Sequence, residues 1–111
     1  MAEAFKNAGL ELTQTPTLVY TCPVGSKAIV IGLIIANIDG VVDADATVYW
    51  VDTSASITHY LAFTTPVASD SVLSLIGGAV GKIVLEENDS LYASASANGD
   101  LSLTLAVVEI S

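Results

Sequence analysis

Apolar residues in this chain fall into short runs that turn-forming residues separate. The runs are rich in valine, isoleucine, leucine, threonine and tyrosine, and glycine, proline, asparagine and aspartate interrupt them. This composition and spacing favour β-strands over helices. The longest apolar run, Ala28–Ala36, is short, whereas a membrane-spanning helix needs about 20 apolar residues. The pattern therefore predicts an all-β protein with no membrane-spanning helix.

Eight segments carry a strand pattern, with turn signals about 8 to 12 residues apart. Ser26–Ile38 is apolar at both alternating positions, so we expect it to be a central strand covered on both faces. Asn98-Gly99 predicts a tight hairpin before the last strand. The expected strands are Leu18–Cys22, Ser26–Ile38, Ala46–Val51, Ile57–Phe63, Ser71–Ile76, Gly81–Leu85, Leu91–Ser96 and Leu101–Ile110.

The strand pattern predicts an antiparallel β-sandwich, jelly-roll-like, of about eight strands. Residues 1–16 lack alternation, and we expect them to form an extended N-terminal arm outside the main sheets. Residues 17–111 then form a single β-sandwich domain, long enough to fold around one core. The expected core consists of Ile29, Ile31, Leu33, Ile35, Val48, Trp50, Leu61, Phe63, Leu73, Leu75, Val84, Leu91, Leu103 and Leu105.

The composition indicates more apolar surface than one small domain can bury. Apolar residues make up 52% of the chain and charged residues 14%, and the mean hydropathy is +0.66. Such a protein buries part of its outside against another molecule, and closed symmetry makes a homo-oligomer the usual solution. The net charge of −9, with three basic residues, argues against nucleic acid and anionic membranes as partners.

Candidate catalytic groups are few. His59 is the one histidine and could serve a hydrolase together with a serine, but no G-x-S-x-G elbow is present. It alternates with Ile57 and Leu61, which favours a packed histidine. Cys22, the one cysteine, is expected to be a buried strand residue. We expect no catalytic residue, no cofactor and no enzymatic activity.

Carboxylates are scattered along the chain, with the densest group at Asp39, Asp43 and Asp45. Calcium prefers several oxygen ligands on one loop, but this spacing does not match an EF-hand. The group that follows, Glu86-Glu87-Asn88-Asp89, has the composition of a turn. We interpret both as solvated loops and expect no metal site, which leaves weak cation binding open.

Aromatic side chains on the expected strands offer a second kind of surface. Tyr49 and Trp50 are adjacent, so one of them faces away from the core. An exposed tyrosine or tryptophan suits a protein interface. Together with Tyr60, these residues could also be stacking platforms, which leaves a host-surface glycan-binding module as an alternative function.

Three segments of the chain form recognisable motifs: EAFKNAGLEL, TLVYTCPVGSKAIVIGLIIANID and KIVLEENDSLYASASANGDLSLTLAVVEIS. They resemble a group of small virion proteins of tailed bacteriophages, and the similarity extends from Phe5 to Ser111. Asn88 stands where the related sequences have glycine, and asparagine still tolerates a left-handed turn conformation. These motifs are structural rather than catalytic.

The resemblance implies a capsid decoration (cement) protein, a trimer on the outside of the head that bridges neighbouring major capsid subunits. A tail, baseplate or fibre-adaptor protein is the alternative location. The first ten residues contain no apolar signal segment, so we expect synthesis in the host cytoplasm and incorporation into the virion. The expected arm would dock on a neighbour. Candidate interface residues are Phe5, Leu10, Leu12, Tyr20, Tyr49, Trp50 and Tyr60.

Overall fold

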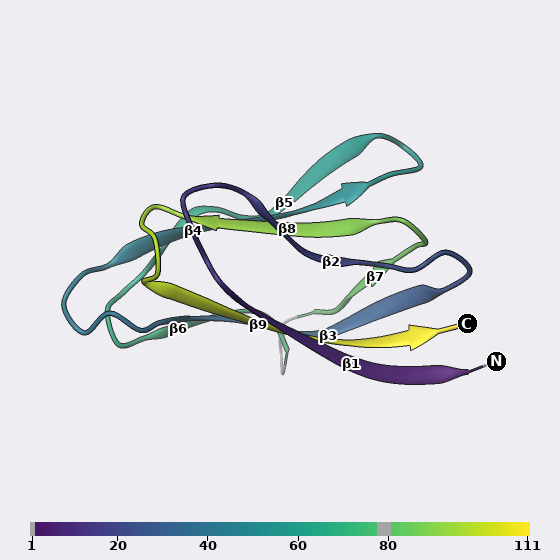
Figure 1. Cartoon of the computed structure of the whole chain (residues 1–111), viewed down its shortest axis with the longest axis horizontal. Coiled ribbons are helices and arrows are strands. Elements are labelled where there is room, and N and C mark those ends of the chain that lie inside the picture. Colours follow the sequence, from purple (N-terminus) through teal and green to yellow (C-terminus); the bar gives the residue numbers. More distant parts are fainter. Residues whose placement is uncertain (1, 78–80) are drawn as a thin grey trace.

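The computed structural model describes residues 2–77 and 81–111 as a two-layer all-β sandwich (Figure 1). No helix in these residues is long and apolar enough to cross a membrane. The strands are β1 (Glu3–Glu11), β2 (Thr17–Thr21), β3 (Lys27–Asn37), β4 (Ala44–Asp52), β5 (Ile57–Val67), β6 (Val72–Ile76), β7 (Ile83–Leu85), β8 (Ser90–Ala95) and β9 (Leu101–Ile110).

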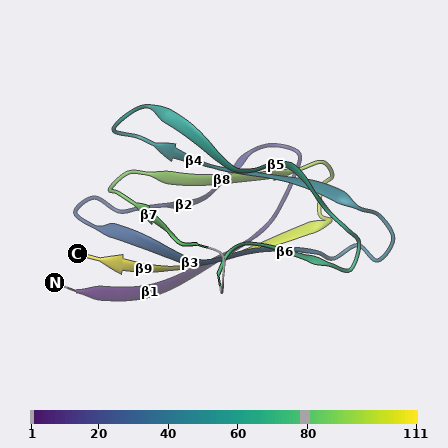
Figure 2. The same cartoon turned by 180° about the vertical axis from the view of Figure 1, so that it is seen from behind.

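The strands form two antiparallel sheets. Sheet A has the order β1-β9-β3-β6, with the short β7 also paired to β3, and sheet B has the order β2-β8-β4-β5. Most consecutive strands alternate between the two layers, as Figure 2 shows from behind. A five-stranded and a four-stranded sheet wound in this way form a jelly-roll-like sandwich, so the expected fold class is confirmed.

The expected N-terminal arm is wrong. Residues 3–11 form β1, an edge strand of sheet A that pairs with β9 from Glu3 opposite Ile110 to Glu11 opposite Ser102. Ala2 and Ser111 extend this pairing through two reciprocal backbone hydrogen bonds of 2.9 Å. Backbone pairing requires no apolar alternation, and β9 would otherwise leave a row of unpaired amides at the edge of the sheet.

A β-bulge explains why β3 is apolar at both alternating positions. The pairing of β3 with β9 shifts register between Val30 and Gly32. Ala28 and Val30 are buried before the shift, and Leu33 and Ile35 are buried after it. A bulge adds one residue, so the inward-facing parity changes from even to odd. The expectation that both faces are covered is therefore wrong, because the remaining apolar residues lie on the outer face of sheet A.

The core lies between the sheets and contains part of the expected set. Expected core residues that are buried are Leu33, Ile35, Val48, Leu91, Leu103 and Leu105. Half-buried members of the set are Ile29, Ile31, Trp50, Leu61, Leu73 and Leu75. Phe63 and Val84 are exposed, because each belongs to the outward-facing residues of its strand.

The expected hairpin at Asn98-Gly99 is also wrong. β8 and β9 belong to different sheets, so these residues form a corner between the layers. Gly99 has a φ of +81°, whereas Asn98 is not among the residues with positive φ, and a type I′ turn requires positive φ at both. Asn88 does adopt the left-handed conformation, with a φ of +69°.

Candidate functional site

The outer face of sheet A carries a row of apolar side chains that crosses four strands. In the strand register Phe5 lies opposite Val108, Val108 opposite Ile29, and Ile29 opposite Val84. Residues directly opposite in antiparallel strands share a face. Phe5 is 75% exposed and Val84 is 56% exposed. Ile29 is half-buried and Val108 is 8% exposed, so this apolar row (Phe5, Val108, Ile29 and Val84) exposes its apolar surface mainly at its two ends.

The outer face of sheet B carries a different row, made of one leucine and several aromatic residues. Leu18 lies opposite Tyr92, Tyr92 opposite Tyr49, and Tyr49 opposite Tyr60. The rings of Tyr49 and Tyr92 stack with centroids 5.3 Å apart and an interplanar angle of 13°. Partial burial, with Tyr92 and Tyr60 close by, raises the pKa of Tyr49.

Phe63 extends this aromatic row at the edge of β5. Its ring meets Tyr60 edge to face at 5.1 Å, and the Phe63 side chain is 65% exposed. The aromatic row (Leu18, Tyr92, Tyr49, Tyr60 and Phe63) therefore spans sheet B from edge to edge. The alternation of buried and exposed positions in β8 and β4 could have shown that Tyr92 and Tyr49 each face outward. That the two rings lie side by side depends on the strand register, which the sequence does not give.

Trp50 and His59 lie on the opposite parity of β4 and β5 and stack on each other. Their ring centroids are 4.8 Å apart at 26°. Trp50 is half-buried against the core, and His59 is exposed at the edge strand. His59 is expected from the sequence to be a packed core residue. It does pack on an aromatic ring, but it is exposed and does not belong to the core.

A partly buried polar network, centred on Glu109, ties the two sheets together where the termini meet. The Tyr20 hydroxyl of β2 donates a hydrogen bond of 2.5 Å to Glu109 Oε2 of β9. Lys6 Nζ of β1 lies 2.9 Å from Glu109 Oε1. The hydrogen bonds from Tyr20 and Lys6 lower the pKa of Glu109, while burial and the bond to Glu109 raise the pKa of Tyr20. Tyr20 thus joins the sheets.

The remaining expected interface residues on β1 and beyond it face inward. Leu12 is fully buried in the core, and its backbone N–H bonds the carbonyl of Leu101 at 2.8 Å. Leu10 is half-buried against the same core. Neither side chain is free to anchor a neighbouring protein, whereas Phe5, Tyr49 and Tyr60 keep outward positions.

Three carboxylates converge at one end of the sandwich. One oxygen from each of Asp52, Glu86 and Asp89 lies within 4.8 Å of the others. Both oxygens of Asp89 already accept backbone hydrogen bonds, from Thr53 N at 3.1 Å and Glu86 N at 3.0 Å. Asp89 therefore holds two loops together, and its oxygens are occupied in a structural role.

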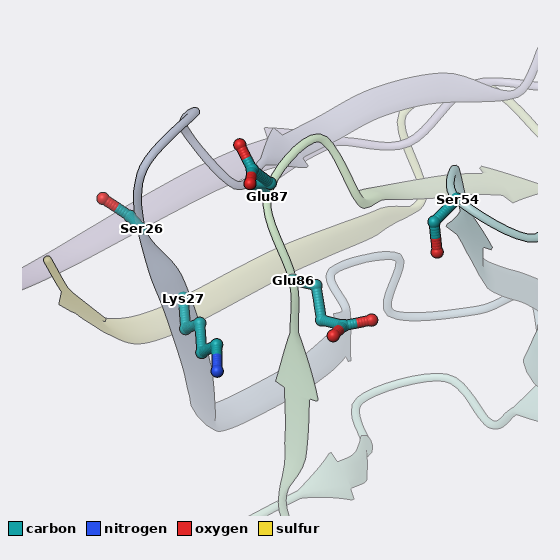
Figure 3. A pocket seen from close by; sticks show the side chains of 5 residues that line it. All are labelled: Ser26, Lys27, Ser54, Glu86 and Glu87. Carbon is teal, nitrogen blue, oxygen red and sulfur yellow. The ribbon is translucent and has the colours of Figure 1, made fainter.

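A shallow cavity of about 230 Å³ lies beside these loops, lined by Ser26, Lys27, Ser54, Glu86 and Glu87. Figure 3 shows that the charged ends of Glu86 and Glu87 point in different directions. The five lining residues all have polar or charged side chains, and none of them is an expected interface residue.

The carboxylates between Asp39 and Asp45 serve their own loops. Asp39 Oδ1 accepts hydrogen bonds from the N–H groups of Val41 and Val42, which lower its pKa. Asp43 Oδ1 accepts one from Ser69 N at 3.0 Å. Within the described residues, this loop does not contribute to a group of three carboxylates that could hold a metal ion.

Comparisons with known proteins give structural similarity alone. No family model matches the chain, and a search of curated proteins found no match. A chain from Bacillus endospore appendages, a family of disulfide-linked pili, is 8% identical, with a TM-score of 0.53, over 99% of this chain and 87% of that one. At this identity the likeness concerns the fold.

Two virus-derived chains match with lower scores. A pentameric capsid protein from metagenomic phage sequences is 18% identical, with a TM-score of 0.44, over 91% of this chain and 63% of that one. A chain of the infectious bursal disease virus Gt strain is 11% identical, with a TM-score of 0.46, over 96% of this chain and 31% of that one. This chain thus spans less than two thirds of the length of either.

Proposed function

We propose that this protein is a structural component of a bacteriophage virion, a decoration protein that binds the outside of the capsid and bridges neighbouring major capsid subunits. The observation that carries the proposal is the apolar row, in which Phe5 and Val84 remain exposed on a well-packed sandwich. Exposed apolar surface of this kind marks a protein–protein contact. The sequence resemblance supplies the class of particle.

Homo-oligomerisation is part of the proposal, and the resemblance favours a trimer. A closed ring can cover one apolar face of each copy and leave the aromatic row free for a second contact. Several weak contacts made by one rigid oligomer sum to tight attachment. The net charge of −9 suits a position away from packaged DNA, because phosphates repel an acidic surface.

The proposed role involves no catalysis. His59, the residue on which a hydrolase would depend, stacks on Trp50 at the edge of sheet B. A nucleophile and its base need to lie within hydrogen-bonding distance of each other. The buried carboxylates of Asp89 and Glu109 are occupied in joining strands and loops.

The glycan-binding alternative is weakened by the packing of the aromatic row. A sugar stacks on an open ring face, but Tyr49 and Tyr92 cover one face of each other. Trp50 likewise has one face against His59. A role in disulfide-linked pili is disfavoured as well, because Cys22 is the single cysteine and is fully buried.

The number of copies per particle tests the proposal. Quantitative mass spectrometry of purified virions that contain this protein is expected to give copies in the range of the major capsid protein, and immunogold labelling is expected to mark the head. A few copies, or a few dozen confined to tail fractions, would instead place the protein in the tail or baseplate. Specific glycan binding that is lost in Tyr60→Ala would favour the host-surface function.

A further inference from the structure

The four edges of the sandwich differ in how well they are protected against pairing with another strand. β2 has five residues and a register shift between Leu18 and Tyr20. β5 contains Pro66, two register shifts and a positive φ of 45° at Thr64. β6 and β7 have five and three residues. Short strands, bulges and prolines are the usual ways in which proteins block edge pairing.

β1 has none of these protections. It runs for nine residues in unbroken register with β9 and contains neither proline nor a positive φ. Its outer edge faces solvent along most of its length. One inward-pointing charge, Lys6, could have discouraged pairing, but Glu109 holds it at 2.9 Å.

The hydrogen-bond phase of β1 identifies which backbone groups are free. Ala2 and Ser111 exchange both of their hydrogen bonds, and Leu12 N bonds Leu101 O. In an antiparallel pair, every second residue forms hydrogen bonds with the partner strand. Because Ala2 and Leu12 are bonded, the even-numbered residues of β1 bond to β9. The N–H and C=O groups of Phe5, Asn7 and Gly9 consequently point to the open edge, at the regular spacing that an added strand requires.

Gly9 supports the same interpretation. A Cβ at this position would meet Leu103 O at 3.8 Å, an ordinary contact, and Gly9 does not have positive φ. The packing of this chain therefore does not require glycine there. Glycine inside a strand costs stability and often marks a place where another backbone or a large side chain approaches closely.

We propose that the free edge of β1 binds an extended segment of a partner protein by strand addition, and that this segment carries basic residues near both ends. Glu3 and Glu11 are the first and last residues of β1, and the whole chain carries a net charge of −9. Backbone hydrogen bonds supply affinity in strand addition, and side chains supply selectivity. The identity of the partner as a capsid protein rests on the proposed function, but the binding mode does not.

A second copy of the chain fits this edge less well. Antiparallel pairing of two β1 strands over all nine residues, centred on Asn7, places Glu3 of each copy opposite Glu11 of the other. Like charges directly opposite destabilise a strand pair. The edge therefore favours a partner of opposite charge.

Synthetic peptides test the proposal on the intact protein. The probe is a nine-residue peptide of alternating valine and threonine with a lysine at each end, and its counterpart carries glutamate at each end. Amide hydrogen exchange followed by NMR should show Phe5, Asn7 and Gly9 exchanging fast in the free protein and slowly with the lysine peptide. The lysine peptide should bind about tenfold or more tightly than the glutamate peptide, and the double variant Glu3→Lys, Glu11→Lys should reverse this preference.

N-methylation tests whether the backbone mediates binding. Methylating the valines, whose N–H groups would face β1, should abolish binding, while methylating the threonines should preserve it. Asn7→Pro should also lose binding, because it removes an N–H that β9 does not use, and Asn7→Ser is its matched control. Since the methylated peptides leave the protein unchanged, the proposal remains testable if Asn7→Pro does not fold.

Equal binding of the two methylated peptides, or no protection of Phe5, Asn7 and Gly9, would overturn the proposal. A concentration-dependent dimer that protects these amides without peptide would make a second copy the occupant and would overturn it too. These outcomes are separate from the proposed function: a protein abundant on virion heads that binds no peptide would keep its decoration role and lose this binding mode.

Discussion

The Tyr20 hydroxyl and Glu109 Oε2, 2.5 Å apart, join the two sheets through a side-chain hydrogen bond. The two residues are 89 positions apart in the sequence. Tyr20 belongs to sheet B and Glu109 to sheet A. Glu109 lies near the end of the sandwich where β1 and β9 bring the termini together (Figure 1), so the contact joins the two layers at that end.

Removing the Tyr20 hydroxyl should destabilise the fold. In Tyr20→Phe, the ring keeps its packing but Glu109 loses its hydrogen-bond donor and retains Lys6. Hydrogen bonds to charged groups contribute about 1.5–3 kcal/mol, and the partial exposure of Tyr20 places the expected loss near the lower end. Urea unfolding of the two proteins at neutral pH measures the difference. Tyr60→Phe, on an exposed ring, is the matched control and should change stability little.

The same pair predicts loss of stability at both extremes of pH. The folded-state pKa of Glu109 lies below its ordinary value of 4.5, so its contribution is present above that value and is lost as pH falls through the folded pKa. The pKa of Tyr20 is raised above 10.0, so its contribution is present below pH 10 and is lost as pH rises beyond it. Tyr20→Phe should shift the midpoint of acid unfolding to higher pH. It should also reduce the loss of stability at alkaline pH, because the group that titrates there has been removed. Circular dichroism across the pH range measures both, and an unchanged acid midpoint would contradict the assignment.

The sequence predicted the fold class because alternation and turn residues are local signals. The inward residues of β9, Leu101, Leu103 and Leu105, follow the period of two and are all buried. In β3 the same rule failed, because the bulge at Ile31 changes which parity faces inward. A bulge depends on the register with neighbouring strands, which no single segment specifies.

β1 could not be recognised from its own residues. The stretch EAFKNAGLE has no strong alternation, and its inward side chains are as varied as Ala8, Leu10 and the ion-paired Lys6. What makes it a strand is the edge of β9, contributed by the other end of the chain. The apolar and aromatic rows were missed for the same reason, because each is assembled from strands that are distant in sequence.

Leu12→Ala and Phe5→Ala should differ strongly in their effect on stability. Leu12 is fully buried, so Leu12→Ala should cost about 2–5 kcal/mol. Phe5 is 75% exposed, and Phe5→Ala should change the free energy of unfolding by about 0.5 kcal/mol or less. Thermal or urea unfolding measures both. Deleting residues 1–12 should unfold the domain, because it removes β1 and a core leucine together; a deletion variant with native stability would show that β1 is dispensable.

Cys22 should be unreactive in the native protein. Its side chain is fully buried, and burial raises the pKa of the thiol, with the carboxylates of Glu109 and Asp89 adding to the effect. The thiolate is the reactive form, so a disulfide reagent should modify Cys22 only as fast as the protein opens. The measurement is the rate of modification with and without urea. Rapid modification of the folded protein would contradict the burial.

Val84 and Val41 provide a matched pair for the apolar row. Val84 is 56% exposed within the row, and Val41 is 85% exposed in the loop between β3 and β4. If the apolar row forms the contact between copies, Val84→Ser should shift the protein from oligomer to monomer, because a polar side chain in a buried contact loses its water without replacement. Val41→Ser should leave the oligomer intact. Light scattering over a range of concentrations measures the mass, and unfolding curves establish that both variants fold. Equal effects of the two substitutions would contradict a contact between copies through the apolar row. A wild-type protein that remains monomeric at high concentration would contradict it as well.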